Sequence, residues 1–235
     1  MKRGVLEKVF AYFENKKYEW EVIVTDDGST DKSGKIASER IKKLKNFRLL
    51  KNPHGGKPSA LLYGIKKAKG EYVLFTDMDQ STPIKELDKF LKFTREGYEV
   101  VIGSRGIKRK NFPFYRRMGA VLFMAFRKAL ILPEIDDTQC GFKLIKTDLL
   151  RKTFPELDYF KNKKKVKGWK VTSYDVELLH MLKKEGARIK EVRVVWDDQD
   201  TSQSKGGYLK RYIKESLDMI KQILKVKLND IRGRY

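Results

Sequence analysis

Apolar and polar positions in the first half of the chain alternate between two periods. The apolar residues from 5 to 13 recur at helical spacing, so the chain is predicted to open with a helix. Short apolar runs typical of buried strands follow at 21–24, 47–50, 72–76 and 99–102. Helical patterns lie between them at 33–45, at 58–68 and from 83 to about 96. Strands that alternate with helices predict an α/β fold with a mixed, mostly parallel sheet flanked by helices.

The second half begins with a long apolar stretch, 112–132, that is interrupted by basic residues. These basic residues make the segment too charged to span a bilayer, so it is expected either to lie at a surface or to be a core helix. They are Arg116, Arg117, Arg127 and Lys128. Farther along, the pattern predicts a helix at 175–184 and a strand at 189–196.

One apolar stripe runs along the last predicted helix, 208–231. Its positions step by three or four residues, and basic side chains surround it. The stripe comprises Leu209, Ile213, Leu217, Ile220, Leu224, Leu228 and Ile231. A basic amphipathic helix of this kind can lie on an anionic membrane, pack on its own domain or pack on a second subunit. We therefore expect one domain over 1–206, with halves at 1–110 and 111–206, followed by a helical segment at 207–235.

Composition and charge narrow the class of protein. A chain of 235 residues with 40% apolar content can bury the core of one α/β domain. Its formal net charge of +22 favours phosphorylated substrates, anionic lipid headgroups or nucleic acid as partners, although lysine-rich surfaces also occur in heat-stable proteins. Cys140 is the only cysteine, and His54 and His180 are far apart, so neither a disulfide nor a zinc site is expected.

The sequence also bears on the relation to membranes. The N-terminus lacks the apolar stretch of a secretion signal, and no uncharged run approaches the roughly 20 residues of a membrane span. Any membrane contact is therefore expected to be peripheral.

Two predicted strands run directly into acidic loops. Asp26 and Asp27 follow the run 21–24. Asp77 directly follows the run 72–76, and Asp79 lies two residues later. Because ligands of open α/β sheets bind outside the carboxyl ends of the strands, both loops are expected to face one crevice. Two carboxylates at such a strand end can share a hard cation that neutralises a diphosphate. Acidic and small polar residues after a strand are also ordinary turn and helix-cap residues, so each motif is weak by itself.

Seven short motifs follow one another along almost the whole chain. They are Thr25–Asp31, Gly56–Lys57, Asp77–Asp79, Gly103–Arg105, Asp137–Lys143, Tyr174–Glu177 and Ser204–Lys205. This ordered set resembles the family 2 glycosyltransferases with the GT-A fold, in particular the branch of dolichyl-phosphate glucosyltransferases and dolichol-phosphate mannose synthases. One departure is that the usual first strand, which lies centrally in the sheet of such relatives, is missing before the opening helix. Its absence predicts either a gap beside 22–24 or a different role for the N-terminus.

The resemblance implies a metal-dependent, inverting transfer of a hexose from a nucleotide sugar to dolichyl or polyprenyl phosphate, at the cytoplasmic face of a membrane. The residues implied to bind the nucleotide are Asp26, Asp27, Gly56, Lys57 and Asp77, and those implied to hold Mg²⁺ or Mn²⁺ are Asp77 and Asp79. The implied catalytic residues are Asp79, Arg105, Asp137 and Gln139. The cations implied to steer the acceptor phosphate are Arg116, Arg117 and Lys205, together with Arg105, which the motif places best.

The favoured donor is UDP-glucose, because the form of the segment 138–140 resembles the glucosyl branch, and GDP-mannose is the second choice. A phosphate acceptor is already an anionic nucleophile, so the transfer needs no strong general base. Two other classes stay open. A basic nucleic-acid-binding protein would explain the charge but not the carboxylates, and since no recognised motif of that class appears, nucleic acid is not expected as a partner. An inactive glycosyltransferase-like scaffold would agree with the missing strand.

Overall fold

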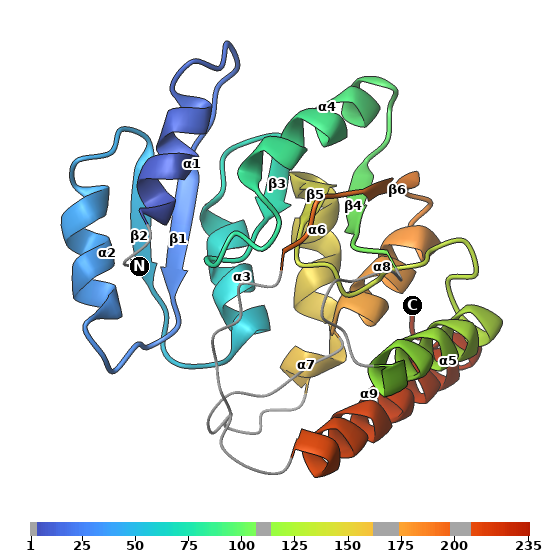
Figure 1. Cartoon of the computed structure of the whole chain (residues 1–235). Coiled ribbons are helices and arrows are strands. Elements are labelled where there is room, and N and C mark those ends of the chain that lie inside the picture. Colours follow the sequence, from blue (N-terminus) through green and yellow to red (C-terminus); the bar gives the residue numbers. More distant parts are fainter. Residues whose placement is uncertain (1–3, 107–113, 162–173, 198–207) are drawn as a thin grey trace.

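A computed structural model describes residues 4–106, 114–161, 174–197 and 208–235 (Figure 1). The elements of the first half are α1 Val5–Phe13, β1 Val22–Asp26, α2 Ser33–Ile41, β2 Phe47–Lys51, α3 Lys57–Lys67, β3 Tyr72–Phe75, η1 Ile84–Glu86, α4 Leu87–Arg95 and β4 Val100–Ser104. Those of the second half are α5 Phe114–Leu130, β5 Lys143–Lys146, α6 Thr147–Thr153, η2 Phe154–Glu156, α7 Asp158–Lys161, α8 Tyr174–Lys184, β6 Ile189–Arg193 and α9 Tyr208–Ile231.

The order of helices and strands predicted for the first half is confirmed, with ends that shift by a few residues. The helix expected at 33–45 ends at Ile41, and the one expected after 83 begins with a turn of 3-10 helix before α4. In the second half β6 ends at Arg193 rather than at 196. The pattern gave no prediction for β5 or for the short helices that follow it, because β5 has four residues and a lysine at each end.

The described strands form two sheets. In the smaller sheet β1 pairs with β2 in parallel, with Val24 opposite Leu49. The larger sheet has the order β3-β5-β4-β6, in which β5 is antiparallel to both neighbours and β4 is parallel to β6. The strands β3, β4 and β6 therefore point the same way and only β5 is reversed, so the predicted mixed, mostly parallel sheet is confirmed. Among the described strands, no partner joins β1 to β3.

Two hydrophobic clusters cover opposite faces of the larger sheet. Val100 and Ile102 of β4 belong to one cluster and Val101 belongs to the other, as the alternation of side chains along a strand requires. The first cluster includes Ile65 of α3 and the apolar side of α8. The second cluster includes residues of α1, α2 and α4 and extends to Val24 of β1. Helices thus pack on both faces of the fold.

The helices α5 and α9 pack against each other beside the larger sheet (Figure 1). Arg127 of α5 is 1% exposed and donates a hydrogen bond to the Leu132 carbonyl oxygen (2.8 Å), so the end of α5 belongs to the core. The buried face of α9 carries Ile223 and Val226. No helix within the described ranges is long and apolar enough to cross a membrane.

Between Leu217 and Ile231, where burial is described, the apolar stripe predicted for the last helix is largely exposed rather than packed on the domain. Four of its members are exposed instead: Leu217, Leu224, Leu228 and Ile231. On α5, the neighbouring Met118, Val121 and Leu122 are exposed as well. The helix α9 therefore has two apolar sides, one in the core and one facing outward.

Candidate functional site

The loops after β1, β2 and β3 meet at one edge of the fold. The carboxylate of Asp27, after β1, accepts hydrogen bonds from the backbone of the loop after β2, at 3.0 Å from Gly55 N–H and 2.7 Å from Gly56 N–H. The side chain of Asn52 donates to the same carboxylate at 2.6 Å. At the start of α3, Lys57 reaches the loop after β3 and places its Nζ 2.6 Å from Oδ1 of Asp77. The predicted single crevice therefore has a physical basis in these contacts.

The carboxylates of Asp26 and Asp27 both stabilise loops at this edge by accepting backbone hydrogen bonds. One oxygen of Asp26 accepts the backbone N–H of Ser29 at 2.9 Å, which closes the turn after the strand. A side chain at Gly34 would lie 2.5 Å from the other oxygen, so Gly34 lets α2 begin directly beside Asp26. The turn interpretation and the ligand-binding interpretation of this motif therefore apply together.

Lys57 and Asp77 form the centre of the site. Burial lowers the pKa of the Lys57 ammonium, but the carboxylates of Asp77, Asp175 and Asp79 outweigh it and hold that pKa above its usual value. Lys57 therefore stays a cation at neutral pH. A Cβ at Gly141 would come within 2.0 Å of Oδ2 of Asp77, so only glycine leaves room for the carboxylate in this position.

Asp79 lies exposed two residues farther along, and its Oδ1 accepts the backbone N–H of Ser81 at 2.9 Å. Within the described ranges there is no group of three or more His, Cys, Asp or Glu side chains that could hold a metal ion. Asp77 and Asp79 supply hard oxygen ligands, and a Mg²⁺ or Mn²⁺ ion commonly completes its shell with water and substrate phosphate oxygens. The pair therefore fits a cation that arrives with a diphosphate.

Arg105 and Asp137, both predicted to be catalytic, form one buried ion pair. The guanidinium donates from Nε to Oδ2 at 2.7 Å and from Nη2 to Oδ1 at 2.8 Å, and the backbone N–H of Arg105 adds a third bond. Burial lowers the pKa of Arg105, but the bond and charge of Asp137 outweigh it, so the pKa is raised. Asp137 thereby neutralises the charge of Arg105 within the protein. The guanidinium carbon Cζ of Arg105 lies 5.8 Å from the centroid of the Trp196 ring.

Gln139 links this pair to the C-terminal helix. Its backbone N–H donates to Oδ1 of Asp137 at 3.1 Å, and its side-chain Nε2 lies 2.9 Å from Sδ of Met219 on α9. Glu191 of β6 holds the same segment from the other side by accepting the backbone N–H of Asp137 at 2.8 Å. The segment around Asp137 is thus fixed by β4, β6 and α9.

Three residues of this region had no role in the sequence-based prediction. Lys143 is 1% exposed and pairs with Asp175 at 2.5 Å, Asn52 holds Asp27, and Glu191 holds Asp137. Lys143 lies inside a recognised motif, and Asn52 directly follows a strand, so both had a signal. Glu191 had none, since it lies within a strand of mixed polarity.

The remaining residues named from the sequence are the single cysteine and three cations implied to steer the acceptor phosphate. Cys140 is buried, and burial raises the pKa of its thiol, which agrees with a packing role. Arg116 and Arg117 lie on the first turn of α5, and only their place on the helix is described. Lys205 lies outside the described residues.

The sequence matches Glycosyl transferase family 2 over residues 3–154. Since this region is more than half of the chain, the protein belongs to that family, and the predicted resemblance is confirmed. A dolichyl-phosphate beta-glucosyltransferase of Trichomonas vaginalis is 28% identical over 96% of this chain and 69% of its own length. A dolichyl-phosphate beta-glucosyltransferase of Dictyostelium discoideum is 30% identical over 92% of this chain and 65% of its own length. The chain thus spans about two thirds of the length of these relatives.

Solved structures show the same fold. Mannosyl-3-phosphoglycerate synthase from Rubrobacter xylanophilus superposes with a TM-score of 0.61 and 14% identity, over 99% of this chain and 70% of that one. Glucosyl-3-phosphoglycerate synthase from Mycobacterium tuberculosis, in complex with Mn²⁺, UDP-glucose and phosphoglyceric acid, gives a TM-score of 0.55 and 18% identity over 95% and 74%. At such identities the likeness shows the fold alone, and it confirms the predicted GT-A class.

Proposed function

We propose that this protein transfers glucose from UDP-glucose to dolichyl or polyprenyl phosphate with inversion at the anomeric carbon. The observation that carries the proposal is the cluster of Lys57, Asp77 and Asp79 where the loops after β1, β2 and β3 meet. The relatives named dolichyl-phosphate beta-glucosyltransferase support the choice of sugar and acceptor, since they match this chain over both of its halves. GDP-mannose remains the competing donor.

The departing diphosphate is the group that needs stabilisation. When the bond from the anomeric carbon to the diphosphate breaks, its electron pair stays on the nucleoside diphosphate, and negative charge grows there. A divalent cation held by Asp77 and Asp79 would supply Lewis-acid neutralisation of that charge. Lys57 contributes a permanent positive charge beside these carboxylates, because its pKa is raised. Asp26, Asp27 and Gly56 would contact the nucleoside from the neighbouring loops.

The acceptor phosphate forms the new bond to the anomeric carbon through one of its oxygens. It is already ionised at neutral pH, so no side chain has to remove a proton. We assign steering of this anion to Arg116, Arg117 and Lys205. Arg105 is matched by Asp137 and acts as a positioning residue that holds the segment of Gln139 beside the site.

Contact with a membrane follows from the acceptor and from the outward apolar side of α5 and α9. Leu122 is 66% exposed and Ile231 is 70% exposed, and basic residues occur along both helices. An amphipathic surface of this composition binds anionic bilayers by burying apolar side chains while its basic residues attract the headgroups. The two helices would then bring the site to the lipid phosphate.

Calorimetric titration of UDP, and separately of GDP, into the purified chain with and without Mn²⁺ tests the donor site. We expect Mn²⁺-dependent binding of UDP, with at least about tenfold weaker binding by Asp79→Ala. Asp148→Ala is the matched control, because this carboxylate of α6 is 86% exposed and lies outside the site. Binding of GDP alone would replace glucose by mannose, and binding of neither nucleotide would remove the proposed activity from this chain.

A second candidate is a glycosyltransferase-like scaffold without activity. One observation favours it, namely a cavity of about 480 Å³ directly beside β1, which weakens the support of the nucleotide-binding loop. Normal folding with no metal-dependent nucleotide binding would identify this case.

A further inference from the structure

Both oxygens of the Asp77 carboxylate contact another part of the protein. Oδ1 accepts a hydrogen bond from the Lys57 ammonium at 2.6 Å. Oδ2 faces Gly141, since a Cβ added to that glycine would lie 2.0 Å from it. A divalent cation that binds Asp77 through Oδ1 must therefore share this oxygen with the ammonium or displace it. Two cations on one oxygen lie only a few ångströms apart, so their repulsion disfavours sharing.

The backbone of Lys57 is fixed, whereas its side chain can change place. Lys57 begins α3, and the two residues before it, Gly55 and Gly56, donate backbone hydrogen bonds to Asp27 at 3.0 and 2.7 Å. The Lys57 side chain is 48% exposed, and a lysine ammonium sits on a flexible four-carbon stem. The ammonium can therefore leave Oδ1 of Asp77 without a change in the fold.

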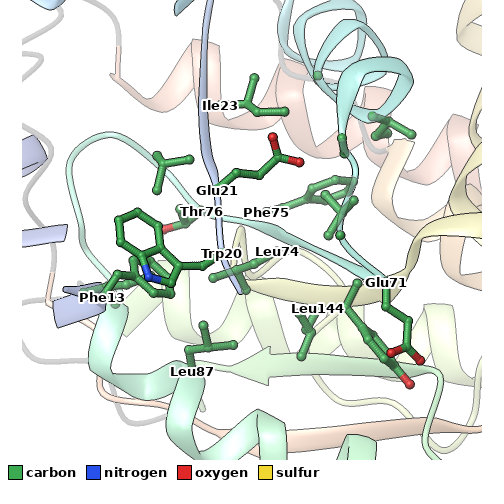
Figure 2. A pocket seen from close by; sticks show the side chains of 18 of the residues that line it. Phe13, Trp20, Glu21, Ile23, Glu71, Leu74, Phe75, Thr76, Leu87 and Leu144 are labelled. Carbon is green, nitrogen blue, oxygen red and sulfur yellow. The ribbon is translucent and has the colours of Figure 1, made fainter. Parts of the chain in front are cut away.

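Asp77 is less free to move, although a cavity lies beside its strand. Figure 2 shows Phe75, the last residue of β3, and Thr76 at the wall of this cavity between β1 and β3. Phe75 is nevertheless buried, and its ring packs edge-on against Phe154 with centroids 5.9 Å apart. Gly141 limits the carboxylate from the side of Oδ2. The lysine side chain, rather than the loop of Asp77, is therefore the part that yields to a cation.

A second carboxylate keeps the Lys57 ammonium near the site. The charge of Asp175, at the start of α8, also acts on Lys57. One oxygen of Asp175 pairs with the ammonium of Lys143 at 2.5 Å. Lys143 is buried and also donates to the Cys140 carbonyl oxygen, so Asp175 is held in place. A displaced Lys57 ammonium is thus still attracted to this edge of the fold.

A nucleoside diphosphate offers the ammonium a new partner. Lysine binds phosphate oxygens as a compact point charge, and the same diphosphate supplies oxygen ligands to a divalent cation. A cation that binds alone adds two positive charges beside Lys57, whereas a cation that arrives with a diphosphate adds no net positive charge. Repulsion by Lys57 therefore acts against the free cation and not against the complex of cation and diphosphate.

We propose that Lys57 excludes a free divalent cation from Asp77 and releases this carboxylate when a nucleoside diphosphate binds its ammonium. Cation and diphosphate then bind cooperatively, and each raises the affinity for the other by the same factor. Lys57 thus selects the complex of cation and diphosphate over the free cation. The inference rests on the proposed function, because it concerns the donor and the cation of that same site.

Titrations of Mn²⁺ alone test the exclusion, with free Mn²⁺ measured by electron paramagnetic resonance. They compare the unsubstituted chain with Lys57→Met, which removes the charge, and Lys57→Arg, which keeps it. We expect Lys57→Met to bind Mn²⁺ at least about tenfold more tightly than the other two, because it lacks the like charge beside the cation.

Lys16→Met is the matched control for the loss of one positive charge. Lys16 pairs with Asp88 at 2.8 Å, outside the site. Mn²⁺ should bind this variant as weakly as it binds the unsubstituted chain. Melting curves of all four proteins establish that each is folded, as expected for Lys57 because its side chain is half exposed.

The same titrations with saturating UDP test the cooperativity, with mixtures of UDP and Mn²⁺ without protein as the reference. UDP should raise the affinity of the unsubstituted chain for Mn²⁺ by a factor at least about tenfold larger than in Lys57→Met. The reason is that only the unsubstituted chain has an ammonium to transfer from Asp77 to the diphosphate.

Three results would overturn the proposal. One is a Lys57→Met variant that binds Mn²⁺ no more tightly than the unsubstituted chain. Another is a Lys16→Met control that binds Mn²⁺ as tightly as Lys57→Met does, and the last is an equal gain from UDP with and without the ammonium of Lys57. The proposed function fails separately, if none of the four proteins binds UDP with Mn²⁺, and the titrations of Mn²⁺ alone still decide the role of Lys57.

Discussion

The two sheets carry the same kind of acidic loop on very different support. Every residue of β4 is buried, and Val100, Val101 and Ile102 are 0% exposed. In β1 only Val24 is buried, and a cavity lies along one edge. The loop of Asp77 follows β3, which borders the same cavity but is joined through β5 to the packed β4, whereas the loop of Asp26 and Asp27 follows one strand of a two-stranded sheet. The polar contacts of the site are thus in place although β1, which carries Asp26 and Asp27, is incompletely packed.

Hydrogen bonds in the loops of the smaller sheet compensate locally for the incomplete packing of its strands. Asp27 alone gathers three donors from the segment 52–56, and the ammonium of Lys57 ties the start of α3 to Asp77. These bonds fix the loops relative to one another without help from the strand edges. The comparison predicts that substitutions in the two sheets differ in their effect on stability even where the chemistry of the change is identical.

The largest effect is expected from truncating the same residue type in each sheet. Ile102→Ala in β4 should lower the free energy of unfolding by about 2–5 kcal/mol, because it leaves a hole in a close-packed core. Ile23→Ala in β1 should cost about 1 kcal/mol or less, since this side chain already borders a cavity. Urea denaturation of both variants measures the difference. Equal costs would contradict the contrast between the sheets.

A substitution at Gly141 should damage the site and spare the fold. In Gly141→Ala the new Cβ would lie 2.0 Å from Oδ2 of Asp77, so the carboxylate must move. We expect glucosyl transfer to fall by about 10²-fold, since a displacement near 1 Å in a catalytic group has effects of that size. A transfer assay with dolichyl phosphate, together with a melting curve, separates the two effects. Unchanged transfer would show that the position of Asp77 does not matter.

A smaller effect of opposite sign is expected on the cavity side. A Cβ at Gly64 of α3 would meet only Cγ2 of Thr25, at an ordinary 3.4 Å. Gly64→Ala should raise the free energy of unfolding by roughly 0.5–1 kcal/mol, as alanine favours the helix. Gly103→Ala in β4 is the matched control and should destabilise, because its Cβ would lie 2.9 Å from Sγ of Cys140. Thermal unfolding of both variants tests whether the two signs differ.

The smallest effect concerns Asp88, whose side chain links α4 to the end of α1. Its Oδ1 accepts bonds from the Tyr12 hydroxyl and the Lys16 ammonium, each at 2.8 Å. Burial raises the pKa of Asp88, but Lys16 and Tyr12 outweigh it and lower that pKa below 3.8. This carboxylate therefore contributes stability above pH 3.8, and the contribution is lost as the pH falls through the lowered pKa.

Asp88→Asn should lower the free energy of unfolding by about 0.2–1 kcal/mol near neutral pH, because the ion pair of Asp88 and Lys16 is half exposed. The difference from the unsubstituted chain should shrink in strong acid. Urea unfolding at several pH values measures it, and a cost that stays constant into strong acid would assign the effect to something other than charge.

The sequence determined the local structure of the first half and the place of its acidic loops. Periods of two and 3.6 residues are properties of neighbouring positions, so β1, α3, β3 and β4 could be predicted from them. The motif that contains Asp77 and Asp79 could be located for the same reason.

The tertiary structure decided what depends on segments far apart in the chain. The four residues of β5 become a strand because β3 and β4 pair with both of their edges, and Lys143 is buried there because Asp175, 32 positions later, neutralises it. The outward side of α9 was set by where α5 and α8 pack, which left Leu224 exposed and Ile223 buried. Local patterns encode the period of an element, but its neighbours decide which side meets the core and which polar groups find partners.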